Sequence, residues 1–209
     1  MGKMEFNKKK KEDALFNTAF ELFTTKGLTK TTISDIVEKA GVAKGTFYLY
    51  FKDKYDIRNR LISHKTGELL SNAWAALSQT DLTDFEEKML FLVDYILDEL
   101  NRNHALLLFI SKNLSWGMFK GAFEEKLSPE TSAAKQLEDP FLSAISKDGT
   151  FFRDPEIMLF TIIELVGSTC HSCILYHQPT SIEDYKPHLH RAIHGILESF
   201  RIQPEETEK

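Results

Sequence analysis

The chain has 209 residues, of which 42% are hydrophobic and 27% are charged, and it contains only 10 glycines, 6 prolines and 2 cysteines. This composition is that of a globular protein, and it excludes collagen-like, disordered and disulfide-scaffold proteins. The length allows one large domain, or a small domain joined to a larger one.

The net charge of −5 is unevenly distributed along the chain. Residues 1–60 carry 13 lysines and arginines against 8 acidic residues, a net charge of +5, which leaves −10 for residues 61–209. A basic head on an acidic body is typical of a protein whose first part binds a polyanion. A lysine-rich tail on an ordinary acidic protein gives the same balance, so charge alone leaves both interpretations open.

Apolar residues at helical spacing predict an all-α chain, beginning with a helix that ends at Gly27. A short helix is expected over residues 33–40, with Thr32 as its N-cap, and a third over about 44–51 after a break at Gly41. Asp53 can cap a fourth helix. Two short helices joined by so few residues form a helix-turn-helix pattern.

Longer helices are expected downstream. Their starts are indicated by capping residues or by proline in the first turn: Thr83 in the capping-box-like Thr83–Glu86, Asn103, Ser128 with Pro129, Asp154 with Pro155, and Ser181 with Asp184. The helix after Pro155 is expected to reach about His177 and to be a buried helix rather than a membrane span, because its apolar run includes Glu164 and His171. The last helix is expected to be regular only from Pro187.

The segments from Ala14 to Phe23, Gly27, and from Thr32 to Lys54 resemble the TetR family of bacterial transcriptional regulators. About a dozen motif positions agree in order and spacing. The resemblance implies a three-helix DNA-binding domain over residues 1–54, a linking helix over about 54–77, and a helical effector-binding and dimerisation domain over 78–209. Beyond Leu61 it is architectural only.

The third helix is the expected recognition helix. Phe47 and Phe51 lie four residues apart and can anchor it against the first two helices, which leaves the other face for a DNA major groove. Gly45 would let the helix approach the bases, and Lys44 and Thr46 can donate to base edges or phosphates.

By resemblance, backbone phosphates would be contacted by Thr32, Tyr48, Tyr50 and Lys54. Two simpler roles stay open: both tyrosines can be packing aromatics, and Lys54 an ordinary surface lysine. The chain departs from the family pattern at Ala43, where many members have a capping serine. That difference removes one phosphate donor without affecting the fold.

The resemblance also implies a homodimer and a cavity for a small effector. The two last helices are the expected dimer interface, with the amphipathic stripe of the final helix facing the partner. The alternative is that both helices fill the core of a monomer. Candidate residues for the effector pocket are mostly aromatic: Phe91, Tyr95, Trp116, Phe119, Phe123 and His171. Plain core packing is the alternative for each of them.

No cofactor, metal site or catalytic residue is expected. Cys170, Cys173 and His177 share a helical face, and His190 and His194 are four residues apart, but core and surface roles explain them equally well. No phosphate-binding glycine loop, zinc-protease helix or nucleophile elbow occurs. Two cysteines so close in sequence cannot join distant segments, and with no expected leader they predict a cytoplasmic protein.

The sequence therefore predicts a homodimeric repressor that binds operator DNA and is released by a small apolar or aromatic effector. Two alternatives stay open: a DNA-binding regulator controlled by a protein partner, and a helical enzyme whose head binds anions incidentally. The sequence does not indicate the operator, the effector, the regulated genes, or whether the protein represses or activates.

Overall fold

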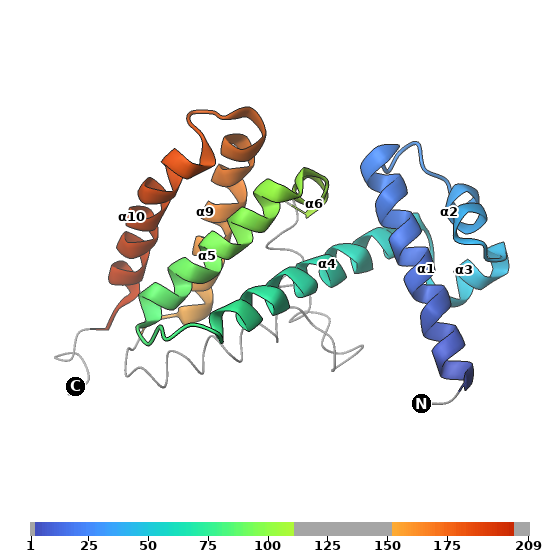
Figure 1. Ribbon diagram of the computed structural model, residues 1–209, viewed down its shortest axis with the longest axis horizontal. Helices are drawn as coiled ribbons and strands as arrows, with labels where there is room; N and C mark the ends of the chain where they lie inside the picture. The colour runs from blue at the N-terminus through green and yellow to red at the C-terminus, as the bar shows by residue number, and fades with distance from the viewer. Residues whose placement is uncertain (1–2, 111–151, 203–209) are drawn as a thin grey trace. The chain divides into compact units, whose positions relative to one another are not determined.

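The computed structural model describes residues 3–110 and 152–202. Within these ranges the chain forms helices, and no strand beyond one isolated bridge between Phe152 and Arg201 (Figure 1). The helices in chain order are α1 (Lys3–Thr25), α2 (Ile33–Ala40), α3 (Lys44–Tyr50), α4 (Lys54–Leu77), α5 (Phe85–Arg102), α6 (His104–Ile110), α9 (Pro155–Tyr176) and α10 (Ile182–Phe200). The all-α fold predicted from sequence is confirmed.

The chain divides into two compact units, residues 1–64 and 65–209, and the division falls within α4. In the first unit, α1, α2, α3 and the start of α4 share an apolar core. Its fully buried members include Leu15, Ile36, Phe47, Phe51 and Ile57. The ring of Phe51 packs at 5.4 Å from that of Phe47 and edge-on at 5.3 Å from that of Phe16. The predicted anchoring of the third helix by Phe47 and Phe51 is confirmed.

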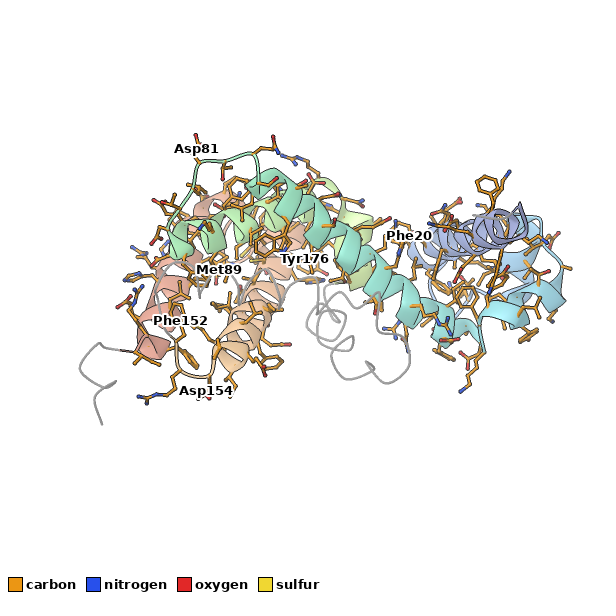
Figure 2. The ribbon with its side chains drawn as sticks, turned by 90° about the horizontal axis from the view of Figure 1, so that it is seen from below. Phe20, Asp81, Met89, Phe152, Asp154 and Tyr176 are labelled. Carbon is orange, nitrogen blue, oxygen red and sulfur yellow. The ribbon has the colours of Figure 1, made fainter. Side chains whose placement is uncertain are left out.

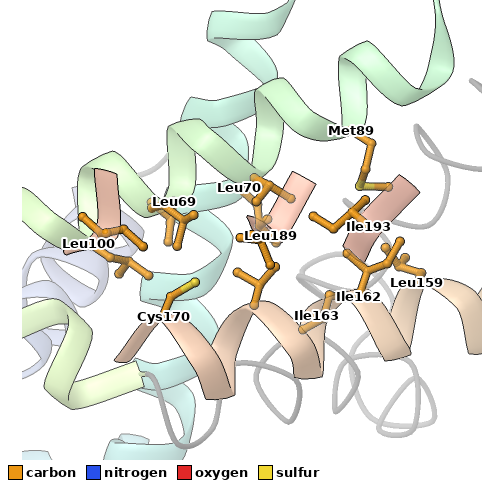
Figure 3. Close-up of a cluster of buried hydrophobic side chains, with 14 of the residues drawn as sticks. Leu69, Leu70, Met89, Leu100, Leu159, Ile162, Ile163, Cys170, Leu189 and Ile193 are labelled. Carbon is orange, nitrogen blue, oxygen red and sulfur yellow. The ribbon is translucent and has the colours of Figure 1, made fainter. Parts of the chain in front are cut away.

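The second unit has its own core, formed where α9 lies beside α10 and α5 (Figures 1 and 3). Each of these helices contributes side chains that interlock in Figure 3, among them Met89, Leu100, Ile162, Leu189 and Ile193. By length and composition alone α9 could cross a membrane. Eight of its residues are buried in this core, so one full face of the helix packs inside the unit.

Short-range capping fixes most helix starts as predicted. Backbone N–H groups donate to Asp53, Asn103 and Ser181 at the starts of α4, α6 and α10. The start of α5 differs from the prediction, because Asp84, and not Thr83, accepts from the N–H of Glu87 and is the N-cap.

The last helix begins at Ile182, directly after its predicted Ser181 cap, and it is regular before and through Pro187 and not only from there. The hydroxyl of Ser181 both accepts from the Asp184 N–H and donates to the Asp184 carboxylate, so the first turn is fixed before the proline is reached. Pro155 occupies the first turn of α9 as predicted, and Asp154 precedes it in the left-handed region, with φ 46° (Figure 2).

Polar pairs join α5 to α10 in antiparallel register. Lys186 pairs with Asp98, and the side chain of Asn101 donates to Glu183 at 3.2 Å. One helical turn apart, His190 Nε2 lies 2.8 Å from Asp94 and His194 Nδ1 lies 3.0 Å from Glu86. The two histidines therefore bind different carboxylates of the neighbouring helix.

The amphipathic stripe of α10 does not face a partner molecule, which corrects the sequence analysis. Leu189, Ile193 and Leu197 are fully buried inside the protein's own core, and Tyr185, Ile196 and Phe200 pack against it. The pattern identified a buried face correctly but assigned it to the wrong neighbour, because intramolecular and intermolecular burial select the same residues.

Replacing Ile193 by Ala should lower the free energy of unfolding by about 2–4 kcal/mol, since the change leaves a cavity in a close-packed core. Urea denaturation followed by circular dichroism measures the effect. Leu108→Ala is the control, because Leu108 is 59% exposed on α6 and should change stability little. Equal effects of the two changes would contradict the assignment of Ile193 to the core.

Candidate nucleic-acid interface

The N-terminus of α2 is fixed by a reciprocal capping box. The Thr32 hydroxyl accepts from the Asp35 N–H at 3.1 Å, and the Asp35 carboxylate accepts from the Thr32 N–H at 2.8 Å. Thr32 itself is exposed, so its hydroxyl proton remains available to an external acceptor. The predicted N-cap is therefore confirmed, and it places a hydroxyl and a helix N-terminus side by side.

A tight turn sets the direction of α3. Gly41 adopts a left-handed conformation, with φ 66°, and the N–H groups of Gly41 and Val42 donate to the carbonyls of Glu38 and Val37. This is the usual glycine-terminated end of a helix. Ala43 then precedes α3 without a side-chain cap, as its missing hydroxyl requires.

Helix α3 buries one edge and exposes the other. Phe47 is fully buried, whereas Lys44, Gly45 and Tyr48 are exposed and Thr46 is half-buried. A Cβ added at Gly45 would meet no atom within 4 Å. The exposed edge is thus open at its first turn, where a partner could approach the helix backbone closely.

Sequence reasoning missed Leu49, which is 81% exposed on the same edge as Gly45. Residues four apart lie on one side of a helix, so the spacing from Gly45 could have indicated it. A large exposed aliphatic side chain is unusual beside so many polar ones, and apolar side chains read the methyl group of thymine in a major groove.

Tyr50 and Lys54 lie at the other end of α3 and already have partners inside the protein. The Tyr50 hydroxyl donates to the Lys8 carbonyl at 3.2 Å, which ties α3 to the start of α1. Lys54 Nζ donates to the carbonyls of Leu28, Thr29 and Thr31 at 3.0–3.3 Å. The side chains of Lys8 to Lys11 are exposed beside this end of α3 and make that region basic.

The charge of Asp35 is held by its neighbours. The ammonium of Lys26 donates to it at 2.8 Å, and this bond, followed by those from Thr32, lowers the pKa of Asp35 from 3.8 to about 2. The carboxylate therefore stays ionised throughout the physiological range, and the capping box with it.

The predicted effector residues lie in the second unit or outside the described residues. Phe91 and Tyr95 are half-buried on α5, and His171 is half-buried on α9, where its ring lies 6.1 Å from that of Tyr176. Trp116, Phe119 and Phe123 are outside the described residues.

The two cysteines are buried thiols on the core face of α9. Burial raises the pKa of Cys170 to about 12, and burial also raises the pKa of Cys173. In the part of the chain that the structure describes, no three His, Cys, Asp or Glu side chains are grouped as metal ligands would be.

Residues 15–61 match the sequence profile of the bacterial regulatory proteins of the tetR family. The matched segment contains the capping box, the Gly41 turn and both edges of α3. Residues 15–61 are a TetR-family segment.

Curated relatives resemble this chain mainly in the same region. It is 47% identical over 62 residues to YvdT, an uncharacterized HTH-type transcriptional regulator of Bacillus subtilis, which is 30% of each chain. It is 38% identical over 63 residues to the fatty acid metabolism regulator protein of the same organism, which is 30% of this chain and 32% of that one. The chain thus spans about a third of the length of these relatives.

Solved structures of TetR-family regulators share the fold over most of the chain. One from Syntrophomonas wolfei aligns with a TM-score of 0.64 and 18% identity, over 90% of this chain and 95% of that one. The fatty acid degradation regulator FadR of Bacillus halodurans aligns with a TM-score of 0.59 and 22% identity, over 88% and 95%. At these identities the likeness concerns the fold alone, including the N-terminal helix-turn-helix and the helical C-terminal domain.

The Asp35 carboxylate should titrate near pH 2 in NMR spectra of the wild-type protein. In Lys26→Met its pKa should rise toward the ordinary value, because the largest cause of the shift is removed. A lowered pKa in the folded state means that the contribution of Asp35 to stability is complete above its unfolded pKa of 3.8 and is lost as the pH falls through about 2. Identical titration curves for the two proteins would show that Lys26 does not hold Asp35.

Proposed function

We propose that this protein is a transcriptional regulator that binds operator DNA through α3 and acts as a repressor. The observation that carries the proposal is the exposed edge of α3, open at Gly45 and held in place by the buried Phe47 and Phe51. An α-helix fits the major groove of B-DNA when one edge can approach the bases without steric hindrance. Such a regulator acts on chromosomal DNA, which supports a cytoplasmic location.

The residues proposed to contact DNA, on α3 and at the start of α2, divide into base contacts and phosphate contacts. Lys44 and Thr46 carry donors suited to base edges, and Gly45 allows the close approach that they need. Thr32 and Tyr48 carry exposed hydroxyl groups that suit backbone phosphates, with the N-terminus of α2 adding its partial positive charge. Tyr50 is expected to act here through its bond to Lys8, which holds the basic start of α1 beside α3.

The protein is proposed to bind DNA as a homodimer. A single short recognition helix makes few contacts, and a two-fold dimer doubles them on a symmetric operator. With the apolar stripe of α10 inside the core, the proposed interface moves to the opposite faces of α9 and α10. There Ile157 is 57% exposed on α9, and Ala192, Gly195 and Ser199 are exposed on α10.

The small side chains on that face of α10 favour a helix-to-helix contact. Their low volume lets the backbone of a second helix come close, which increases van der Waals contact along the whole length. A Cβ added at Gly195 would have no atom within 4 Å, so the space next to this residue is open in the single chain.

The regulator is proposed to respond to a small apolar or aromatic effector bound among the helices of the second unit. Phe91, Tyr95 and His171 provide half-buried aromatic surface with two polar groups, a combination typical of small-molecule sites. The other candidates from sequence, Trp116, Phe119 and Phe123, lie outside the described residues. Two similar proteins are a fatty acid metabolism regulator and a fatty acid degradation regulator, which supports including acyl compounds among the effectors to be tested.

Selection of duplexes from a random DNA pool by the purified protein tests the proposal directly. A regulator of this kind should enrich one two-fold symmetric sequence. The enriched duplex can then be challenged with fatty acids and with aromatic compounds, and release by one class would identify the effector chemistry. A pool that remains random after repeated selection would contradict the proposal.

Gly45→Leu should abolish binding to the selected duplex, because the new side chain would fill the space that the base edges need. The effect on unspecific binding should be small, since phosphate contacts remain. Fluorescence anisotropy with labelled duplexes measures both affinities. Asn17→Leu, which adds a leucine on the exposed side of α1, is the control and should bind as the wild type does. Full operator affinity in Gly45→Leu would end the assignment of α3 as the recognition helix.

Gly195→Arg should convert the dimer to a monomer without unfolding it. The new side chain has room in the single chain but would place an unpaired charge in the proposed interface, where desolvation is costly. Sedimentation velocity gives the oligomeric state, and circular dichroism checks the fold. Gln79→Arg, at an exposed position after α4, should remain dimeric. A dimeric Gly195→Arg variant would place the interface elsewhere.

A further inference from the structure

Lys54 occupies the first position of α4, where the partial positive charge of a helix N-terminus disfavours a cation. Its side chain turns back to the segment between α1 and α2. There the ammonium donates to the carbonyls of Leu28 at 3.0 Å, Thr29 at 3.3 Å and Thr31 at 3.2 Å. An ammonium has three N–H donors, so the three carbonyl oxygens match its donors in number.

The segment that Lys54 contacts is a compact turn with its own internal bonds. Gly27 has φ +85°, and its carbonyl accepts from both the N–H and the hydroxyl of Thr31, at 3.2 and 2.8 Å. Thr31 is fully buried. Without Lys54 the carbonyls of Leu28 and Thr31 would lose a charged donor at a partly buried site, which is unfavourable.

We propose that Lys54 is a positioning residue for DNA binding. Its ammonium joins the first turn of α4 to the turn before α2, and so fixes Thr32, the residue that follows Thr31 and caps α2. A displacement of the start of α4 is then passed through Lys54 to the N-terminus of α2. The inference rests on the proposed function, in which Thr32 contacts a phosphate and α4 leads to the effector-binding unit.

The competing role is the direct phosphate contact expected from sequence. In that role the ammonium would have to exchange at least one backbone carbonyl for a phosphate oxygen. The two roles differ in a measurable way: a phosphate contact affects every DNA sequence equally and changes the dependence on salt, whereas a positioning contact affects the geometry of α2 even when DNA is absent.

The first experiment measures amide hydrogen exchange in the full chain without DNA. The informative amides are those of Asp35 and Ile36, which donate to the hydroxyl and the carbonyl of Thr32. In Lys54→Met their exchange should accelerate by about tenfold or more, because bonds from a charged donor are stronger than neutral ones. Exchange at Ala19, in the middle of α1, should not change, which separates a local effect from general unfolding.

Two further variants complete this experiment. Lys54→Arg keeps the charge, but its planar guanidinium does not match three converging carbonyls, so it should also accelerate exchange at Asp35 and Ile36. Lys52→Met, an exposed lysine two residues away, is the control and should leave exchange at both amides unchanged. Unchanged exchange in Lys54→Met would overturn the proposal.

The second experiment uses the duplex selected by the wild-type chain and a random duplex of equal length. Lys54→Met should weaken binding to the selected duplex about tenfold more than binding to the random one, with an unchanged salt slope. Equal weakening on both duplexes, with the salt slope smaller by about 0.9 for each phosphate that the variant no longer neutralises, would overturn the proposal in favour of the phosphate role. If the wild type selects no duplex, the proposed function fails, while the exchange experiment still decides the role of Lys54.

Discussion

The burial of Phe47 and Phe51 is the interaction on which the proposed DNA-binding surface depends. Helix α3 has seven residues, too few to be stable by itself in water, so its stability comes from packing one edge into the core of the first unit. The two rings occupy that edge and are almost completely buried. Because side chains on a helix have fixed angular spacing, burying this edge determines that Gly45, Tyr48 and Leu49 face outward. The same packing therefore stabilises α3 and exposes its outer edge.

The lysines of the first unit fall into two groups: those paired within the unit, and those exposed without a role in pairing its helices. Lys26 and Lys39 pair with Asp35 and Glu21, and so hold α2 against the end of α1. Lys54 donates to backbone carbonyls of the turn between the same two helices. All three cations therefore have hydrogen-bond partners within the first unit. Other lysines of the unit are exposed, and they are the positive charge most accessible to a polyanion: Lys8 to Lys11, Lys30, Lys44 and Lys52.

Local features of this fold could be predicted from sequence, and non-local contacts could not. The caps at Thr32, Asp53 and Ser181 depend on hydrogen bonds across three residues, so their signal lies in adjacent letters. Lys54 contacts carbonyls 23 to 26 residues away, and Tyr50 contacts a carbonyl 42 residues away. Backbone acceptors carry no sequence signal, because every residue has one. Both residues were consequently assigned to DNA from the motif alone.

For the two last helices, hydrophobic periodicity predicts which face is buried. It does not predict whether that face packs inside the chain or against a partner molecule. Leu189, Ile193 and Leu197 satisfy the pattern inside a single chain. Helix α9 differs from α10, because some of its large apolar side chains are exposed. Ile157 and Tyr176, both more than half exposed, lie on its remaining surface. Covering these side chains would remove apolar surface from water, whereas the α10 stripe is already buried. On α10 the useful property is instead small size, because Ala192 and Gly195 add little apolar area but allow a second helix to approach closely. A contact built from both helices would combine the apolar surface of one with the close approach of the other.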